Sequence, residues 1–155
     1  MKRALLVTEP SLSFAIVGAD PPGRLALVLH GILGMGQNFR TLARRWADAL
    51  PGWGFVLVDL RGHGQSQGFA PPHTLASVSA DLEALSARLG APVRAVIGHS
   101  FGGKVALELV RRQRLELERC VVLDSSPSAR TAPTARMSAQ AVRETLERLP
   151  RTVSR

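Results

Sequence analysis

The stretch that decides the fold reads Val93-Arg94-Ala95-Val96-Ile97-Gly98-His99-Ser100-Phe101-Gly102-Gly103-Lys104. Residues 93–97 are a short apolar run, as expected of a strand that is buried on both faces of a sheet. From about Gly102 to Gln113 the pattern instead predicts a helix. A sharp turn must join the two, and Gly98 and Gly102 let the flanking segments approach closely. The stretch therefore predicts a strand, a tight turn at Ser100, and a helix.

The same strand-and-helix unit recurs on both sides of this turn. Apolar runs at Leu25–Leu29 and Phe55–Leu60 are each followed by a loop and then by a helical pattern. Cys120–Leu123 predicts a fourth strand, which ends at Asp124. Strands that alternate with helices indicate an α/β fold with a mostly parallel sheet and helices on both faces.

Other features of these elements are less regular. Residues 4–8 and 14–18 are two short extended segments and predict an antiparallel hairpin. In the first helix, Asn38 is the expected N-cap. The apolar face of that helix is expected to consist of Phe39, Leu42, Trp46 and Leu50. The second helix is the clearest, since its apolar residues from Leu75 to Leu89 recur every three or four positions.

The chain has 155 residues, of which 45% are hydrophobic and 21% charged, and these values predict one globular domain. We expect residues 1–127 to form the core. Residues 128–155 begin polar and continue as an amphipathic pattern over Arg136–Leu149, which predicts a further helix.

Composition also bears on location and partners. No apolar run approaches the roughly 20 residues that span a bilayer, and Glu9-Pro10 ends the short apolar stretch near the N-terminus, so we expect a cytoplasmic protein without a membrane contact. The lone Cys120 excludes an internal disulfide, and its apolar strand predicts a buried thiol. The net charge of +8 comes mostly from arginines spread over helix faces, and no nucleic-acid motif accompanies it. We expect no nucleic acid, cofactor or metal.

Gly98-His99-Ser100-Phe101-Gly102 matches the Gly-x-Ser-x-Gly pattern of a nucleophile elbow. In such a turn the serine takes a strained backbone conformation, and its hydroxyl is exposed at the N-terminus of the next helix. The dipole of that helix favours developing negative charge. Ser100 is therefore a candidate nucleophile.

Three further motifs precede the elbow, in the order His30-Gly31, Asn38-Phe39 and Asp59-Leu60-Arg61-Gly62-His63-Gly64-Gln65-Ser66. With Gly98–Lys104 they make the sequence resemble the α/β-hydrolase superfamily, in particular its small bacterial and mitochondrial esterase-like members with a Gly-His-Ser-x-Gly-Gly elbow. The resemblance covers about residues 1–127, the N-terminal part of the family's domain, and it implies that residues 128–155 begin a cap segment. It implies a hydrolase that acts on a small-molecule acyl substrate.

The resemblance also implies roles for single residues. Ser100 would attack an acyl carbonyl, and the amides of Phe101 and Ile32 would hold the oxyanion, with Leu33 as the alternative to Ile32. Three histidines would be structural and bond nearby backbone, namely His30, His63 and His99. Three further residues would lock the loop after the second parallel strand, namely Asp59, Arg61 and Ser66.

The remaining members of a catalytic triad are less clear. Asp124 follows its strand in the segment Val122-Leu123-Asp124-Ser125-Ser126-Pro127, where some members of the family carry the triad acid. The alternative is an aspartate that caps the following turn. The triad order in this fold is serine, acid, histidine, yet no histidine follows His99. Relative to the family, we expect the chain to be truncated after the strand that ends at Asp124.

Three hypotheses follow for the function. The first is a serine hydrolase that acts on esters, thioesters or related acyl compounds through an acyl-enzyme on Ser100. The second is a catalytically incompetent truncated or split hydrolase, whose histidine a complementing C-terminal segment would supply. The third is a non-catalytic binding module.

Overall fold

The computed structural model describes residues 10–125, which form a five-stranded sheet with helices on both faces. The strands are β1 (Phe14–Gly18), β2 (Arg24–Leu29), β3 (Trp53–Val58), β4 (Val93–His99) and β5 (Arg119–Leu123). Their order across the sheet is β1-β3-β2-β4-β5; β1 is antiparallel to β3, and the other neighbours are parallel. The α/β fold with a mostly parallel sheet is thus confirmed.

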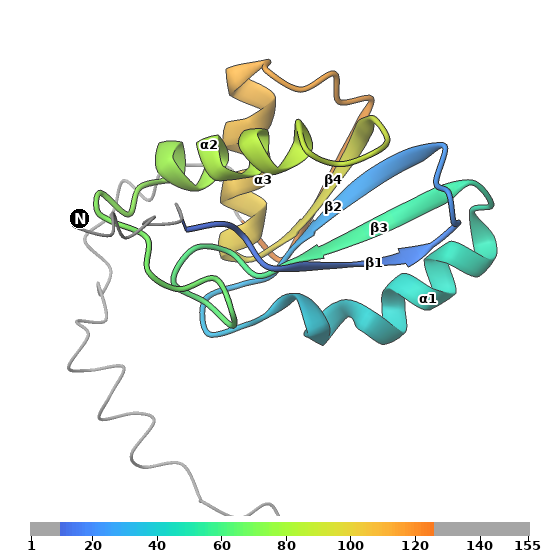
Figure 1. Ribbon diagram of the computed structural model, residues 1–155, viewed down its shortest axis with the longest axis horizontal. Helices are drawn as coiled ribbons and strands as arrows, with labels where there is room; N and C mark the ends of the chain where they lie inside the picture. Colours follow the sequence, from blue (N-terminus) through green and yellow to red (C-terminus); the bar gives the residue numbers. More distant parts are fainter. Residues whose placement is uncertain (1–9, 126–155) are drawn as a thin grey trace, which may run out of the picture.

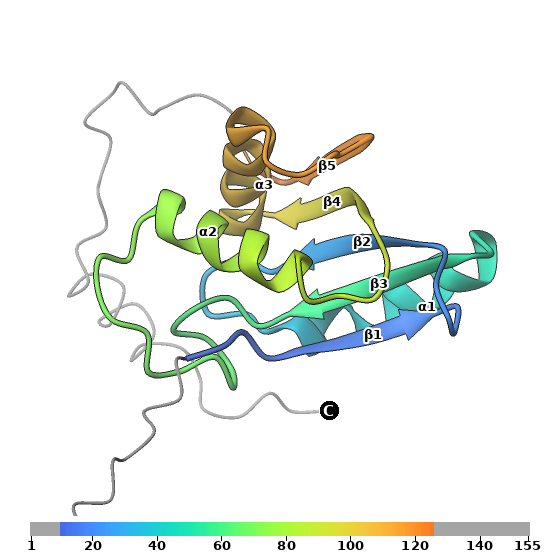
Figure 2. The ribbon, with the colours of Figure 1, turned by 45° about the horizontal axis from the view of Figure 1, so that its top comes forward.

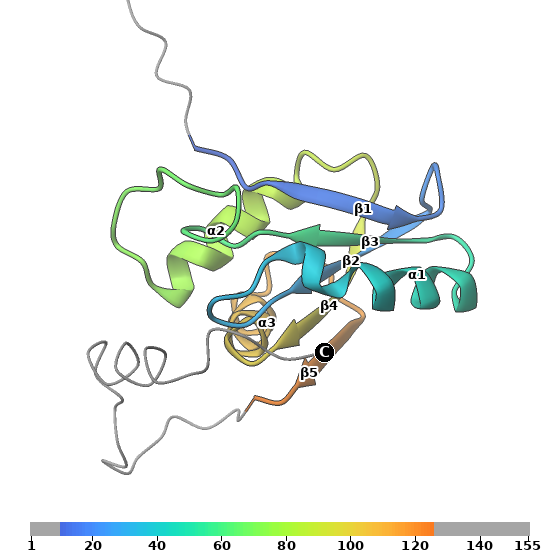
Figure 3. The same ribbon diagram turned by 90° about the horizontal axis from the view of Figure 1, so that it is seen from below.

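Helices cover the two faces of the sheet unequally. A short 3₁₀ helix, η1 (Gly36–Phe39), leads into α1 (Arg40–Ala49), which packs on β1 and β3. On the opposite face lie α2 (Leu75–Ser86) and α3 (Phe101–Arg112). Figure 1 shows α2 and α3 above the sheet and α1 below it, and Figure 3, seen from below, places α1 in front of the strands.

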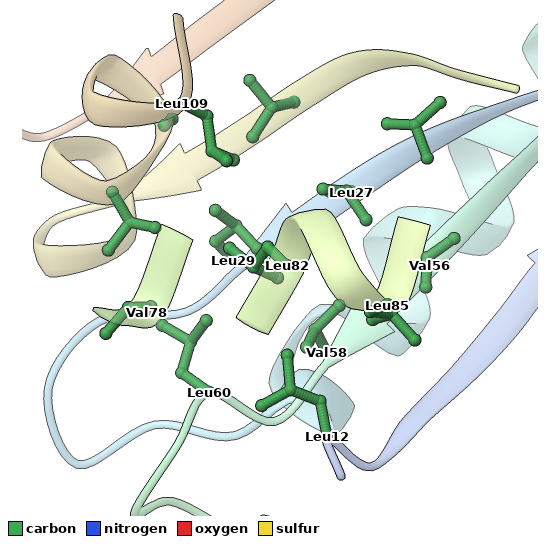
Figure 4. Packing of buried hydrophobic residues seen from close by; sticks show 14 of the residues in the cluster. Leu12, Leu27, Leu29, Val56, Val58, Leu60, Val78, Leu82, Leu85 and Leu109 are labelled. Atoms are coloured by element: carbon green, nitrogen blue, oxygen red, sulfur yellow. The ribbon is translucent and has the colours of Figure 1, made fainter. Parts of the chain in front are cut away.

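The buried side chains of each strand alternate between the two faces, as a two-residue period requires. In β2, Leu25, Leu27 and Leu29 belong to the core under α2 and α3, whereas Ala26 and Val28 face the side of α1. Figure 4 shows the larger core, in which Leu82 and Leu85 of α2 lie over Leu27, Leu29, Val56 and Val58. This burial fixes the register of the sheet and hence the positions of its C-terminal loops.

The structure corrects three details and leaves one prediction untested. Phe14–Gly18 pairs with β3, and its predicted partner at residues 4–8 lies outside the described residues. Asn38 lies inside η1, where its carboxamide accepts the amide of Met35; the N-cap of α1 is Phe39. Leu42 and Leu50 are exposed, because Ala43 and Trp46 instead make the contact with the sheet. Cys120 is exposed, because β5 lies at the edge of the described sheet.

Within residues 10–125, the face that carries α1 is open over the other half of the sheet. Beside α1 a groove of about 470 Å³ lies over β2, β4 and β5. Its lining is mostly apolar and includes Ala26, Phe55, Ala95, Ile97 and Val121. Figure 2 shows the strand order from β1 to β5, with β5 at the edge. Parallel sheets are normally covered on both faces, so this groove is an apolar surface suited to a further element.

Truncation of the buried Leu82 tests the importance of the larger core. We expect Leu82→Ala to lower the free energy of unfolding by about 2–5 kcal/mol, because it removes apolar contacts and leaves a cavity. Leu42→Ala makes the same change in a helix at a side chain that is 38% exposed, and we expect it to cost less than about 1 kcal/mol. Urea denaturation measures both. Equal losses would contradict the packing described.

Candidate active site

The C-terminal ends of β2 and β4 define the candidate site. The two strands are neighbours, with Leu29 beside Gly98 in the ladder. The chain leaves β2 toward α1 on one face and leaves β4 toward α3 on the other. Connections that diverge in this way open a crevice at the sheet edge, where ligands of α/β proteins bind. The loop after β2 and the turn after β4 therefore meet at this point.

Ser100 occupies the turn between β4 and α3 in a strained conformation, with a φ of 51° and a ψ of −112°. Its amide donates to the carbonyl of Leu123 (2.9 Å), and its carbonyl accepts the amide of Gly103 (3.0 Å). It is the N-cap of α3, but its hydroxyl makes no capping hydrogen bond. The side chain is thus left available for chemistry, as predicted for a nucleophile elbow.

Glycines make this turn sterically feasible. A Cβ at Gly98 would overlap with the carbonyl of Gly102, and a Cβ at Gly102 would overlap with the carbonyl of Leu29. The start of α3 therefore lies directly against the end of β2. This close approach brings the elbow and the loop after β2 together.

In the part of the chain that the structure describes, two segments with unbonded backbone amides lie beside Ser100. The first amides of a helix have no intrahelical acceptor, so those of Phe101 and Gly102 remain available at the start of α3. On the other side, a Cβ at Gly31 would be 3.2 Å from the Cβ of Ser100, which places the loop of Ile32 beside the serine. Within residues 10–125, no hydrogen bond involves the Ile32 amide. Two backbone segments, the start of α3 and the loop after β2, thus lie beside Ser100.

His30 holds the loop after β2 in place. Its ring is buried; Nε2 accepts the amide of Leu60 (3.0 Å), so the proton resides on Nδ1, which donates to the carbonyl of Gly31 (2.7 Å). Burial lowers the pKa of His30 below its ordinary value, with the charge of His63 acting in the same direction. A neutral imidazole is what this pair of bonds requires, so His30 has a structural role, as expected.

Asp59 ties the loop after β3 to the loop after β2. One carboxylate oxygen accepts the amide of Gly36 (2.7 Å), and the other accepts the amide of Gln65 (2.9 Å). The hydroxyl of Ser66 donates to the carbonyl of Asp59 (2.6 Å). The sequence predicted that Asp59 and Ser66 fix their own loop; the bond to Gly36 was not foreseen, because no local pattern indicates it.

Arg61 anchors the same loop to α2. Its guanidinium forms a bidentate ion pair with Asp81, with N–O distances of 2.5 and 2.7 Å, and it donates to the carbonyl of Pro72 (3.0 Å). The locking role predicted for Arg61 is thus found in the structure. Its partner Asp81 was not predicted, since an aspartate on a helix gives no signal of a residue 20 positions away.

Asp124 and His99 lie together at the edge next to Ser100. Asp124 directly follows β5, the neighbour of β4, and its carboxylate is 4.0 Å from Nε2 of His99. The Asp124 side chain is 92% exposed. His99 was expected to bond nearby backbone; instead it faces Asp124, and its ring lies 6.2 Å from that of Phe39, centroid to centroid.

The histidines of the described residues do not engage the nucleophile. Within residues 10–125 no hydrogen bond joins a histidine to the Ser100 hydroxyl, and His63 bonds the carbonyl of Arg61 (3.1 Å).

In the same part of the chain, no cluster of three acidic, histidine or cysteine side chains could hold a metal ion. None of the described helices is long and apolar enough to cross a bilayer. Among the described residues, the candidate site thus contains Ser100, the start of α3, the loop after β2 and the carboxylate of Asp124.

Comparison with known proteins identifies the family. The family described as alpha/beta hydrolase fold matches residues 27–155, so this chain belongs to the α/β hydrolases. The chain is 34% identical over 120 residues to the sn-1-specific diacylglycerol lipase ABHD11 of Mus musculus, which covers 77% of this chain and 38% of the mouse protein. It is 36% identical over 107 residues to Lipase LipV of Mycobacterium tuberculosis, covering 69% and 39% of the two chains.

A solved structure shows the same fold. The protein titled marine microorganism esterase superimposes with a TM-score of 0.70 at 24% identity, covering 92% of this chain and 52% of that one. This chain thus spans less than half the length of the two lipases and about half that of the esterase. The proteins that this chain resembles here are named as two lipases and an esterase.

The elbow predicts a sharp difference between two glycine substitutions. We expect Gly98→Ala to lower the free energy of unfolding by about 2 kcal/mol or more, because the new Cβ would overlap with the Gly102 carbonyl. Gly90→Ala is the matched control, since its Cβ would meet no atom within 4 Å. Urea denaturation and circular dichroism compare the two. A tolerated Gly98→Ala would show that the turn is looser than described.

Burial of neutral His30 predicts a dependence of stability on pH. Its pKa is lowered in the folded chain, so below about pH 6.5 the unfolded chain takes up a proton that the folded chain does not. The free energy of unfolding should fall as the pH drops from 6.5 to 5, by at most about 1.4 kcal/mol per pH unit for this residue. His30→Asn should flatten this slope, while a substitution at the exposed His73 should not. Identical slopes in all three proteins would contradict a neutral, buried His30.

Proposed function

We propose that this chain carries the nucleophile of a serine hydrolase that acts on esters, thioesters or related small acyl compounds. The observation that carries the proposal is the strained Ser100, whose hydroxyl makes no capping hydrogen bond and whose Cβ lies against the loop after β2. A serine in this position costs conformational energy, and such strain clusters at functional sites. Relatives that are named lipases are consistent with an ester substrate.

In the proposed reaction, the Ser100 oxygen attacks the acyl carbonyl while a histidine base takes its proton. The negative charge moves to the carbonyl oxygen, where the amides of Phe101 and Ile32 would donate to it. Loss of one such donor typically costs about 3–4 kcal/mol in the barrier. The tetrahedral intermediate expels the alcohol or thiol, which takes the proton from the histidine. Water then attacks the acyl-enzyme and gives a proton to the histidine, and the carboxylic acid is released as the Ser100 oxygen takes that proton back.

We further propose that a complementing C-terminal segment supplies the histidine base. Two observations support this. His30 is buried with both ring nitrogens bonded, and His63 is bonded to its own loop, so neither is placed to accept a proton from Ser100. The apolar groove over β2, β4 and β5 also offers a surface on which such a segment would pack.

Asp124 is the proposed acid of the triad. Its carboxylate lies at the same sheet edge as Ser100 and is exposed, so an incoming imidazole would have access to it. The contact with His99 at 4.0 Å is too long for a hydrogen bond and leaves the acceptor oxygens available.

We also propose that the protein acts in the cytoplasm, where a free exposed thiol such as Cys120 stays reduced.

The residues 1–155 should turn over p-nitrophenyl acetate poorly. Because the base is missing from the described site, we expect a rate about 10⁴-fold or more below that of an intact relative, as for removal of a triad base. Fusing the C-terminal part of a full-length relative, with its histidine, after Ser125 should raise the rate.

Two controls decide the interpretation. Ser100→Ala should abolish the gained activity of the fusion, and a fusion that remains active with Ser100→Ala would refute the proposed nucleophile. Strong Ser100-dependent turnover by residues 1–155 alone would leave the nucleophile in place but refute the external histidine.

A further inference from the structure

The loop that follows β2 exposes apolar side chains to an unusual degree. Ile32 is 68% exposed, Leu33 73% and Met35 44%, and the first two are the most exposed large apolar side chains in the described residues. All three lie within four positions. We call these three residues the apolar loop patch.

Hydrogen bonds hold the backbone of this loop in place, so its exposed side chains are presented from a fixed frame. The amide of Gly34 donates to the carbonyl of Gly31 (3.0 Å), that of Met35 to the carboxamide of Asn38 (2.7 Å), and that of Gly36 to Asp59. Leu33 has a φ of 63°, a conformation that costs a non-glycine residue of order 1 kcal/mol. An exposed leucine held at such a cost points to a ligand that contacts it.

The patch adjoins the nucleophile. Gly31, which precedes it, lies against Ser100 and His99, with a Cβ at Gly31 3.2 Å from the Cβ of the serine. The ring of Phe39, at the end of the same loop, lies near that of His99. A group bound to the Ser100 oxygen would therefore extend over or beside the patch.

The charges near the patch indicate which kind of acyl group would bind there. Residues 31–39 carry no charged side chain in a chain whose net charge is +8. The exposed carboxylate of Asp124 lies 4.0 Å from Nε2 of His99. An anionic acyl group would meet no counter-charge on the loop and would meet repulsion from Asp124, whereas an aliphatic chain would gain contacts with three apolar side chains.

We infer that the apolar loop patch binds the acyl chain of the substrate and sets a preference for medium-length, uncharged aliphatic chains over acetyl groups. Leu33 and Met35 are the residues that determine this preference. The inference rests on the proposed function, since it takes the acyl group to be the one transferred to Ser100.

Methyl ketones test the inference without any need for catalysis, because they carry the carbonyl and the chain of an ester but cannot be hydrolysed. Backbone amide shifts of the full chain are followed in titrations with 2-pentanone and 2-nonanone. A fully buried methylene tightens binding about fourfold; for four additional methylenes at an open patch we expect at least about tenfold tighter binding of 2-nonanone. The shifts should centre on residues 32–36.

Variants assign the effect to the patch. Leu33→Asn replaces the leucine by a polar residue that tolerates positive φ, and Met35→Gln preserves the length of the side chain. Both should reduce the preference for 2-nonanone to a few-fold. Val110→Thr, at a side chain on α3 that is 43% exposed, is the matched control and should leave the preference unchanged. Ser100→Ala should also keep it, so a failure of the proposed catalysis is distinguishable from a failure of the patch.

Three results would overturn the inference. The first is equal affinity for the two ketones. The second is a set of shifts centred on the groove of Ala26, Phe55 and Ile97 instead of the loop. The third is a clearly lower midpoint of urea unfolding for Leu33→Asn than for Val110→Thr, because that would show that protein, and not a ligand, covers the patch.

Discussion

The contact between the start of α3 and the end of β2 is the constraint on which the site depends. The backbone of Gly102 lies against the carbonyls of Leu29 and His30 so closely that no Cβ fits between them. Burial of β2 and β4 on both faces fixes the two strands side by side, and the glycines let their C-terminal connections meet. Ser100 then comes to lie between the first amides of α3 and the loop after β2.

Polar groups keep this arrangement in register. His30 and Asp59 each bond two backbone groups in different segments, and together they link the loops after β2 and β3. Arg61 extends the link to α2 through Asp81. Both ring nitrogens of His30 bond backbone groups of the protein, which explains why this histidine is structural although it lies near Ser100. Arg112 and Glu83 join α3 to α2 in a similar ion pair, so arginine content reflects internal bonding as well as surface charge.

Most of the fold was predictable because it depends on local patterns. The apolar runs of β2, β3 and β4 predicted a parallel sheet, and the glycines around Ser100 predicted the strained turn, since few other backbone paths fit that sequence. The predictions that were wrong or missed concern features that depend on residues far apart in the sequence. The exposure of Cys120 at the edge of the described sheet and the role of Asp81 depend on which segments become neighbours. Leu42 shows a similar limit, since the smaller Ala43 faces the sheet in its place.

The central claim is that the fold makes Ser100, among the serines, the one that accepts an acyl group. The most direct test is to find which serine a fluorophosphonate modifies. Long incubation at high reagent concentration, followed by trypsin and mass spectrometry, reports each serine in one sample. The account predicts slow modification concentrated on the peptide of residues 95–104, which contains Ser100, because the amides beside it stabilise the developing charge. Modification spread evenly over other serines, or absent from this peptide, would contradict it.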